Sequence, residues 1–183
     1  MEEVAGLLLH VFGIDRDLEI NGQLLHSAVD LYCQVWQEEP WNEFDWDIKE
    51  VIADLSLIPK KPGGILILAE VNGRVVGLTA GWQISAKEVA DRTGQADLED
   101  EYSSQKAIFY IAELCTDIRL RGRGIGTRLC EELFREATQS GFDFFILRTH
   151  VKAEPARRIY SGFGFTELPY ADVNYHDRTY WVR

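Results

Sequence analysis

Apolar and polar positions follow a helical period over much of the N-terminal half of the chain. Between residues 24 and 35, apolar side chains recur at helical spacing, and Asn21 stands where a helix cap is expected. A second amphipathic segment spans residues 46–57 and ends in a stretch rich in proline and glycine at 59–64. Residues 2–20 carry mixed signals, for which we expect a short helix and then a first strand.

Strand patterns dominate the middle and the C-terminal half. Residues 65–71 and 74–84 are apolar runs joined by Asn72-Gly73, a pair typical of a type I′ turn, so they predict an antiparallel hairpin. The polar, acidic segment 87–104 predicts a helical excursion or a flap. The other predicted elements are strand 106–116, helix 124–139, strand 143–149, helix 154–161, strand 163–168 and a last strand near 175–182. Because strands and helices interleave without a linker or a repeat, we expect one α/β or α+β domain over residues 1–183, with a mixed central sheet.

The strand predicted at 106–116 is apolar on both faces, which is typical of a central strand. Strict alternation places Glu113 on one face with Phe109 and Ile111, where it is the only carboxylate. If Glu113 is partly buried there, desolvation raises its pKa toward the range useful to a general base. The alternative is that Glu113 lies at the solvent edge or pairs with an arginine, and the pattern leaves both possibilities open.

The link between this strand and the next helix is basic and rich in glycine. It reads Arg121-Gly122-Arg123-Gly124-Ile125-Gly126. A helix start exposes unpaired N–H groups and the positive end of the helix dipole, and glycines let the backbone approach a ligand closely. This segment therefore predicts a site for a phosphate or a pyrophosphate rather than a simple solvated turn.

Known phosphate-binding patterns narrow the choice. The Walker pattern needs a lysine and then a serine or threonine after its last glycine, whereas Gly126 is followed by Thr127-Arg128. The dinucleotide pattern G-x-G-x-x-G lacks its third glycine from either possible start. The spacing that fits is R-x-x-G-x-G, formed by Arg121, Gly124 and Gly126.

A second pattern follows the strand predicted at 143–149. Ala156 and Tyr160 stand on the next helix and precede Gly162-Phe163-Gly164-Phe165. In order and spacing, the two patterns resemble the two signatures of the GNAT superfamily, the N-acetyltransferases that use acetyl-CoA, and the resemblance covers about residues 20–183. It implies a GNAT-like fold, in which helices flank a mixed, mostly antiparallel central sheet within a single domain.

The resemblance also implies how the coenzyme binds. Backbone groups of the strand would pair with the pantetheine arm, and amides at the helix start, with an arginine, would hold the pyrophosphate. The residues expected to bind acetyl-CoA are Leu114, Cys115, Thr116, Arg121, Gly122, Arg123, Gly124, Ile125, Gly126 and Thr127. One position departs from the family pattern: an asparagine that often stands three residues before the motif alanine is here Ala153. This departure keeps open an alternative, a non-catalytic acyl-CoA-binding regulatory module of the same fold.

The activity implied is transfer of an acetyl group from acetyl-CoA to a primary amine by direct attack in a ternary complex. Glu113 would act as the general base, with Glu43, Glu70 or an ordered water as alternatives, and Tyr160 would protonate the departing sulfur. A packing role competes for Tyr160, because it falls on an apolar helical stripe with Ala156 and other residues.

The loop between the first two predicted helices shapes the acceptor pocket in this family. Trp41 and Glu43 in this loop would suit an amine through cation–π contact and charge, although tryptophans are also common in protein cores. The expected acceptor is a small-molecule amine or a protein amine. The sequence leaves open the acceptor's identity, the acyl chain length and the oligomeric state, although homodimers are frequent in the family.

Composition sets the remaining bounds. The net charge of −11 argues against a nucleic-acid partner, and no apolar run approaches the ~18 residues of a membrane span. Cys33, Cys115 and Cys130 are odd in number and lie in apolar contexts, so we expect buried thiols in a cytoplasmic protein. An apolar strand also disfavours Cys115 as a nucleophile. The four histidines lack metal-ligand spacing, and no metal is expected.

Overall fold

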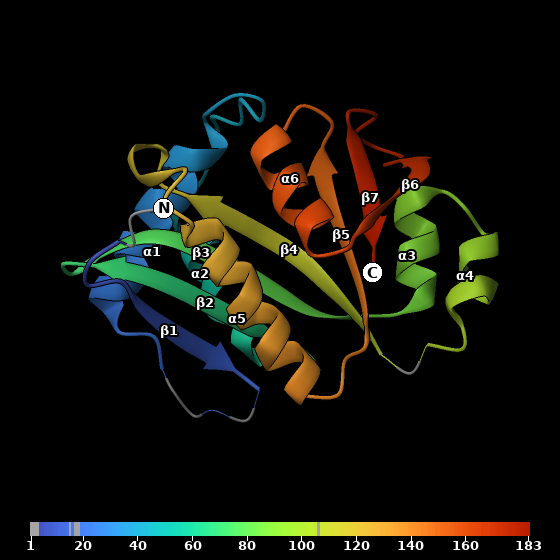
Figure 1. Cartoon of the computed structure of the whole chain (residues 1–183), viewed down its shortest axis with the longest axis horizontal. Coiled ribbons are helices and arrows are strands. Elements are labelled where there is room, and N and C mark those ends of the chain that lie inside the picture. The colour runs from blue at the N-terminus through green and yellow to red at the C-terminus, as the bar shows by residue number, and fades with distance from the viewer. Residues whose placement is uncertain (1–3, 15, 17–18, 106) are drawn as a thin grey trace.

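The computed structural model of the chain describes residues 4–14, 16, 19–105 and 107–183, which form one seven-stranded sheet with helices on both faces (Figure 1). The strands are β1 (Leu8–Gly13), β2 (Ile65–Val71), β3 (Arg74–Ile84), β4 (Ile108–Thr116), β5 (Phe144–His150), β6 (Thr166–Ala171) and β7 (Arg178–Val182). The helices are α1 (Gly22–Trp36), α2 (Ile48–Leu57), α3 (Ala86–Thr93), α4 (Asp97–Tyr102), α5 (Ile125–Gln139) and α6 (Glu154–Gly162), with short 3₁₀ turns at Ile58–Lys60 and Ile118–Leu120. None of these helices is long and apolar enough to cross a membrane.

The strand order is β1-β2-β3-β4-β5-β7-β6. All neighbouring strands are antiparallel except β4 and β5, which are parallel. Their pairing begins at Ile108↔Phe144 and ends at Ile111↔Leu147, although β4 continues to Thr116. The two central strands therefore separate beyond Ile111. The predicted α+β class with a mixed, mostly antiparallel sheet is confirmed.

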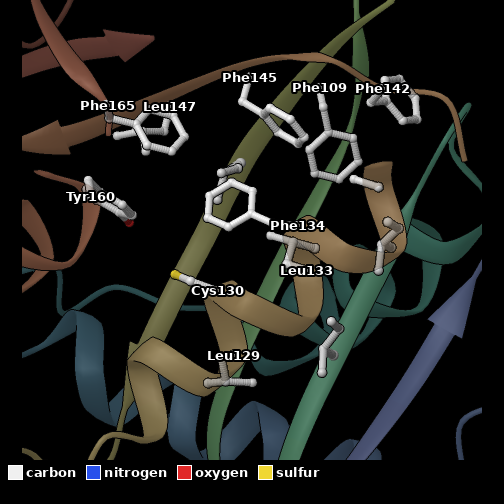
Figure 2. Packing of buried hydrophobic residues seen from close by; sticks show 14 of the residues in the cluster. Phe109, Leu129, Cys130, Leu133, Phe134, Phe142, Phe145, Leu147, Tyr160 and Phe165 are labelled. Atoms are coloured by element: carbon white, nitrogen blue, oxygen red, sulfur yellow. The ribbon is translucent and has the colours of Figure 1, made fainter. Parts of the chain in front are cut away.

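Helices cover the two faces of the sheet in different ways. In Figure 1, α5 lies in front of the sheet and α1 and α2 lie behind it. Phe109 points to the face of α5 and α6, where it packs in an aromatic-rich core with Phe134 and Phe145 (Figure 2). The next residue, Tyr110, points to the opposite face, which α1 and α2 cover at one end and α3 and α4 at the other. The cores of these two helix pairs meet at Trp82, which packs against both.

A β-bulge in β4 overturns one expectation of the sequence pattern. Ala80 pairs with Glu113 and Gly81 pairs with Ile111, so Ala112 is an extra residue without a partner in the register. The bulge interrupts strict alternation and turns Glu113 to the face of Tyr110 and α1. The prediction that Glu113 shares a face with Phe109 and Ile111 was therefore wrong.

The other predicted elements are close to the observed ones. Asn72 and Gly73 have φ angles of 51° and 78°, as the predicted hairpin turn requires. The acidic segment 87–104 forms α3 and α4, whose start is fixed by a capping box between Ser85 and Glu88. Strand β6 starts later than predicted because Gly164, with a φ of 83°, turns the chain out of α6 first.

The N-terminal segment is only partly described. Its predicted strand is β1, and a turn closed from Leu7 N–H to the Val4 carbonyl stands at residues 4–7, in place of the short helix. The predicted positions at 2–3, 15, 17–18 and 106 lie outside the described residues.

Candidate active site

A cleft of about 830 Å³ opens where β4 and β5 separate. Strand β4, the start of α5, helix α6 and the loop after α1 form its walls. Nine residues predicted to bind the coenzyme line it: Leu114, Cys115, Thr116, Arg121, Gly122, Gly124, Ile125, Gly126 and Thr127. The tenth, Arg123, is exposed and is not part of the lining.

Glycine shapes the floor of the cleft at the start of α5. Gly124 is the N-cap residue with a φ of 81°, a conformation that residues with a side chain rarely adopt. The first backbone bond of the helix runs from Arg128 N–H to the Gly124 carbonyl at 3.0 Å, so the amides before Arg128 have no acceptor within the helix. A Cβ at Gly126 would lie 3.1 Å from Ile159 Cδ1 on α6, which is tighter than an ordinary contact. The arrangement presents backbone donors to a space that only glycine leaves clear.

The Arg121 side chain contacts residues on two sides of this cleft. Its Nε donates to the Thr116 carbonyl at 3.2 Å, and its Nη2 lies 2.6 Å from Glu38 Oε2, in the segment after α1. That oxygen is buried and has no aligned hydrogen-bond donor among the described residues. The guanidinium is therefore close to a carboxylate oxygen that accepts no well-oriented hydrogen bond from the described residues.

Helix α6 supplies a wall that the sequence patterns only partly indicated. Ala153 lines the cleft at the N-cap of α6 and has no side-chain cap, so the departure from the family's asparagine lies inside the cleft. Lys152 and Arg158 also line it, and neither was predicted. Their signal was a cluster of basic residues around a helix start, which sequence alone does not separate from a solvated helix face.

Glu113 lies on β4 next to the cleft residues and faces α1. Tyr32 Oη donates to its carboxylate at 3.5 Å. Burial of the carboxyl raises the pKa of Glu113 to about 8, against the opposing effects of the Tyr32 hydrogen bond and of the Arg148 charge. The residue keeps some exposed surface, so solvent still reaches it. A carboxyl group with such a pKa can exchange a proton near neutral pH.

Tyr160 lies on the opposite side of β4, on α6. It is 5% exposed and packs in the core of α5 and α6, with its hydroxyl turned toward β4 (Figure 2). The hydroxyl makes no hydrogen bond with the residues that the structure describes, yet it is not among their fully enclosed polar atoms. Burial raises the pKa of Tyr160 well above its ordinary value, and Cys130 and Glu113 add to the shift. Its hydroxyl therefore stays protonated at neutral pH.

The alternative carboxylates have other partners. Glu43 Oε1 accepts a hydrogen bond from Arg178 Nη2 at 3.0 Å, and the Arg178 guanidinium lies 4.6 Å from the centre of the Trp41 ring. Trp41 also lines the cleft, whereas Glu43 does not. Glu70 lies within 2.8 Å of His10 Nε2 beside a separate cavity of about 520 Å³.

The thiols near the cleft are poor nucleophiles. Burial raises the pKa of Cys115 far above its ordinary value and that of Cys130 to about 12. Among the described residues, no group of three or more histidine, cysteine, aspartate or glutamate side chains could hold a metal ion.

Comparison with known proteins agrees with this geometry. A model described as the acetyltransferase (GNAT) family matches residues 23–165. An acetyltransferase from Streptococcus agalactiae is 20% identical, with a TM-score of 0.68 over 98% of this chain and 99% of the other. An N-acetyltransferase from Staphylococcus aureus Mu50 is 14% identical, with a TM-score of 0.69 over 98% of each chain. A chain of the NatC complex bound to Gag peptide and CoA is 17% identical, with a TM-score of 0.63 over 95% and 96%. No curated protein sequence matches significantly.

The separated central strands and the glycine-lined helix start define a GNAT-type acyltransferase fold. The family model spans well over half of the chain, and the chain belongs to the GNAT acetyltransferase family. It is an acetyl-CoA-dependent N-acetyltransferase, as predicted. The solved structures, at 20% identity or less, show the fold alone.

Proposed function

We propose that the chain transfers the acetyl group of acetyl-CoA directly to a primary amine while both substrates are bound. One observation carries the proposal: two chemically different sites meet on β4. The glycine-lined cleft reaches Leu114, and the adjacent Glu113 faces α1 with a pKa near 8. A group that can accept a proton therefore stands next to the cleft.

The cleft suits the coenzyme in size and in chemistry. Its volume of about 830 Å³ is within the range of small-molecule sites. The amides at the start of α5 and the Arg121 guanidinium supply donors and positive charge for a pyrophosphate. Beyond Ile111, β4 is no longer paired with β5, so its backbone groups on that side are available to an extended arm. Ala153 offers no side-chain amide to that arm.

A base is needed because an ammonium group has no lone pair with which to attack. When bound, acetyl-CoA supplies an acetyl thioester as the electrophile. Neutralising a lysine-like amine of pKa ~10.4 at pH 7 costs about 4.6 kcal/mol. A general base contributes about 10²–10⁴-fold, or about 3–5 kcal/mol, which offsets most of that cost. Glu113, directly or through a water, takes the proton once its own carboxyl is ionised.

Tyr160 completes the proton transfers as the general acid. Its hydroxyl is protonated at neutral pH and points toward β4, and its neighbour Ile159 lines the cleft although Tyr160 itself does not. It gives its proton to the departing sulfur. The gain is modest because a thiol of pKa ~8.5 is already a fair leaving group. The raised pKa of Cys115 supports attack by the amine itself rather than through an acetylated cysteine.

The test is a panel of amines, amino acids and peptides incubated with the purified chain and acetyl-CoA. We expect release of free CoA thiol with at least one acceptor, together with mass spectrometry that shows no acetylated cysteine in enzyme exposed to acetyl-CoA alone. Binding of acetyl-CoA in calorimetry without thiol release for any acceptor would contradict acetyl transfer and favour a binding module. An acetylated Cys115 would contradict direct attack.

A further inference from the structure

Two aromatic rings pack against each other near Glu113, on the face of the sheet that carries α1 and α3. Trp82 of β3 and Tyr110 of β4 are register partners, and their ring centroids lie 5.7 Å apart in an edge-on arrangement. Each ring carries a basic side chain. Lys61 Nζ lies 3.4 Å from the centre of the Trp82 ring, and Arg92 Cζ lies 4.8 Å from the centre of the Tyr110 ring. The two cations come from the segment before β2 and from α3.

These two cations are not ion-paired with an acidic residue in the described part of the chain. Neither Lys61 nor Arg92 forms an ion pair with any residue that the structure describes, and Asp54 is the carboxylate whose charge is felt most at Lys61. Basic residues elsewhere in this acidic chain are commonly paired, as Arg119 is with Asp117 and Arg157 is with Glu167. Cation–π contact is worth only about 0.5–2 kcal/mol and does not neutralise a charge. The pair therefore remains available to an anion.

The pair belongs to the surroundings of Glu113. The charge of Lys61 acts on Glu113 and lowers its pKa, against the larger effect of burial. Burial comes first among the causes that lower the pKa of Lys61, and the positive charge of Arg92 lowers it further. A third cation, Arg148, also acts on Glu113, but its Nη1 donates to Asp172 at 2.9 Å. Two cations, Arg148 and Lys61, and one carboxylate, Glu43, therefore act on the predicted base of a protein whose net charge is −11.

Local structure explains these positions only in part. A cation near the end of α3 is favoured by the helix dipole, which accounts for a basic residue at position 92. The dipole does not explain why the guanidinium lies over Tyr110, beside a second cation that repels it. The charges of Asp54 and Glu113 reach Lys61, but neither residue forms an ion pair with it in the described part of the chain, so the mutual repulsion of the two cations is opposed only at longer range. An anionic ligand offsets this repulsion.

On the basis of the proposed acetyl transfer, we infer that the amine acceptor also carries an anionic group, a carboxylate or a phosphate, which Lys61 and Arg92 bind while the amine faces Glu113. The acceptor class is then an amino acid or a related zwitterion rather than a polycation. Polyamines and other acceptors rich in positive charge would meet repulsion from both side chains. The two cations act as specificity-determining residues, and Glu113 remains the group that takes the proton.

Matched acceptors test the inference. Each amino acid is compared with its carboxamide, and O-phosphoethanolamine with ethanolamine, so that one arm removes a carboxylate and the other a phosphate. We expect kcat/KM to be at least about tenfold higher for the charged member of the preferred pair, the value of one good charged hydrogen bond. The carboxamide loses its ammonium proton more easily than the amino acid, so a preference for the acid cannot arise from amine ionisation.

Charge-removing variants then assign the effect to residues. Lys61→Gln and Arg92→Gln should each raise KM for the anionic acceptor by about tenfold and leave the KM for acetyl-CoA nearly unchanged. Neither should raise the KM of the neutral partner, and a change in kcat that Lys61→Gln causes through the pKa of Glu113 should be the same for both members of a pair. Lys61→Arg should retain most of the preference. The control is Lys60→Gln, which removes the same charge from the exposed neighbouring residue and should change nothing.

The outcomes separate this inference from the proposed function. Thiol release with neutral and anionic acceptors at equal kcat/KM, or equal effects of Lys61→Gln on the KM of both members of a pair, would overturn the inference and leave the transferase activity intact. Preference for polycations would overturn it as well. Failure of the wild-type chain to release thiol with any amine would overturn the proposed function itself, and this inference with it.

Discussion

The cleft proposed to bind the coenzyme and the side of β4 proposed to bind the acceptor lie next to each other, but different chemical groups form them. The cleft is made of backbone groups and glycines in two short stretches, 114–127 and 152–163. The proposed acceptor side is made of charged side chains, Lys61, Arg92, Glu113 and Arg148, which come from four separate parts of the chain. A site of backbone amides is fixed by turn geometry, whereas a site of side chains is fixed by the tertiary fold.

This difference has a functional consequence. Single substitutions on the acceptor side should change chemistry or specificity without changing coenzyme affinity. Substitutions at the mouth of the cleft should do the reverse. If the two sites are independent in this way, coenzyme binding and turnover can be altered separately. The following variants test this independence.

The largest effect is expected from Glu113→Gln. The variant keeps the shape of the side chain but cannot accept a proton, so kcat/KM should fall by about 10²–10³-fold. Affinity for acetyl-CoA, measured by calorimetry, should stay within a factor of about two, because the carboxyl faces α1 and not the cleft lining. A parallel loss of coenzyme affinity would break the distinction between the two sites.

The pH dependence of the wild-type enzyme sharpens this test. The carboxyl is neutral below its pKa of about 8, so the rate should rise as the pH increases through that value. Deprotonation of the acceptor amine also raises the rate as the pH increases. The pH of that inflection depends on which acceptor is used, whereas the inflection due to Glu113 lies at the same pH for every acceptor. In Glu113→Gln, only the inflection whose pH depends on the acceptor should remain in the pH–rate profile. A fixed inflection that survives in the variant would exclude Glu113 as the base.

The same substitution should affect stability in the opposite direction from activity. The folded state holds the Glu113 proton up to about pH 8, whereas the unfolded chain releases it near the ordinary glutamate pKa of 4.5. Between these values the unfolded state binds fewer protons, so this group lowers the stability of the wild type as the pH rises. Glu113→Gln should therefore unfold at a higher temperature than the wild type at pH 8, with a smaller difference at pH 5. Thermal denaturation followed by circular dichroism at both pH values measures this, and a wider gap at pH 5 would contradict the burial of the charge.

Tyr160→Phe should have a smaller effect, because only the leaving group is involved. We expect kcat to fall by about tenfold, with acetyl-CoA affinity nearly intact. Tyr102→Phe is the matched control, because Tyr102 is similarly buried but is the last residue of α4 and packs in a separate core. Unchanged turnover in Tyr160→Phe would leave packing as the role of this tyrosine.

The two regions also differ in how far the sequence predicts them. The glycine turn and the start of α5 follow each other along the chain, so their spacing, with the family resemblance, was enough to predict nine residues of the cleft lining. Anion binding at this helix start stays a prediction. The face of Glu113 was predicted wrongly because a one-residue bulge at Ala112 cancels the alternation on which the prediction depended.

Long-range pairings on the acceptor side had no signal in the sequence. Glu43 and Arg178 are 135 residues apart, and nothing in the local pattern of either indicates the other. Trp41 and Glu43 were predicted to bind a substrate cation, and in the structure the guanidinium of Arg178 contacts both. Their role in substrate binding stays a prediction. Similarly, Lys61 and Arg92 come close to each other only because β3 and β4 place the aromatic rings that they contact side by side.

The smallest effect concerns the mouth of the cleft, where Glu38 holds Arg121. The pair is partly exposed, and such pairs are worth about 0.2–1 kcal/mol. Pyrophosphate binding has to draw the guanidinium away from Glu38 or share it, so part of the coenzyme's binding energy opposes this contact. Glu38→Gln should therefore lower the Kd for acetyl-CoA by about twofold to fivefold, and Arg121→Gln should raise it. Turnover at saturating substrates should not change in Glu38→Gln.

The control for this variant is Glu39→Gln, which removes the same charge from the next residue, where the structure describes no ion pair. General repulsion of an anionic coenzyme would make both variants tighten binding equally. Competition for Arg121 predicts a stronger effect of Glu38→Gln, and it predicts that the difference disappears when Arg121 is also replaced by glutamine, because the two substitutions then act on one contact. Equal effects of the two glutamate variants in calorimetry would mean that the pair is only a surface contact and that the cleft binds its ligand without releasing Arg121 first.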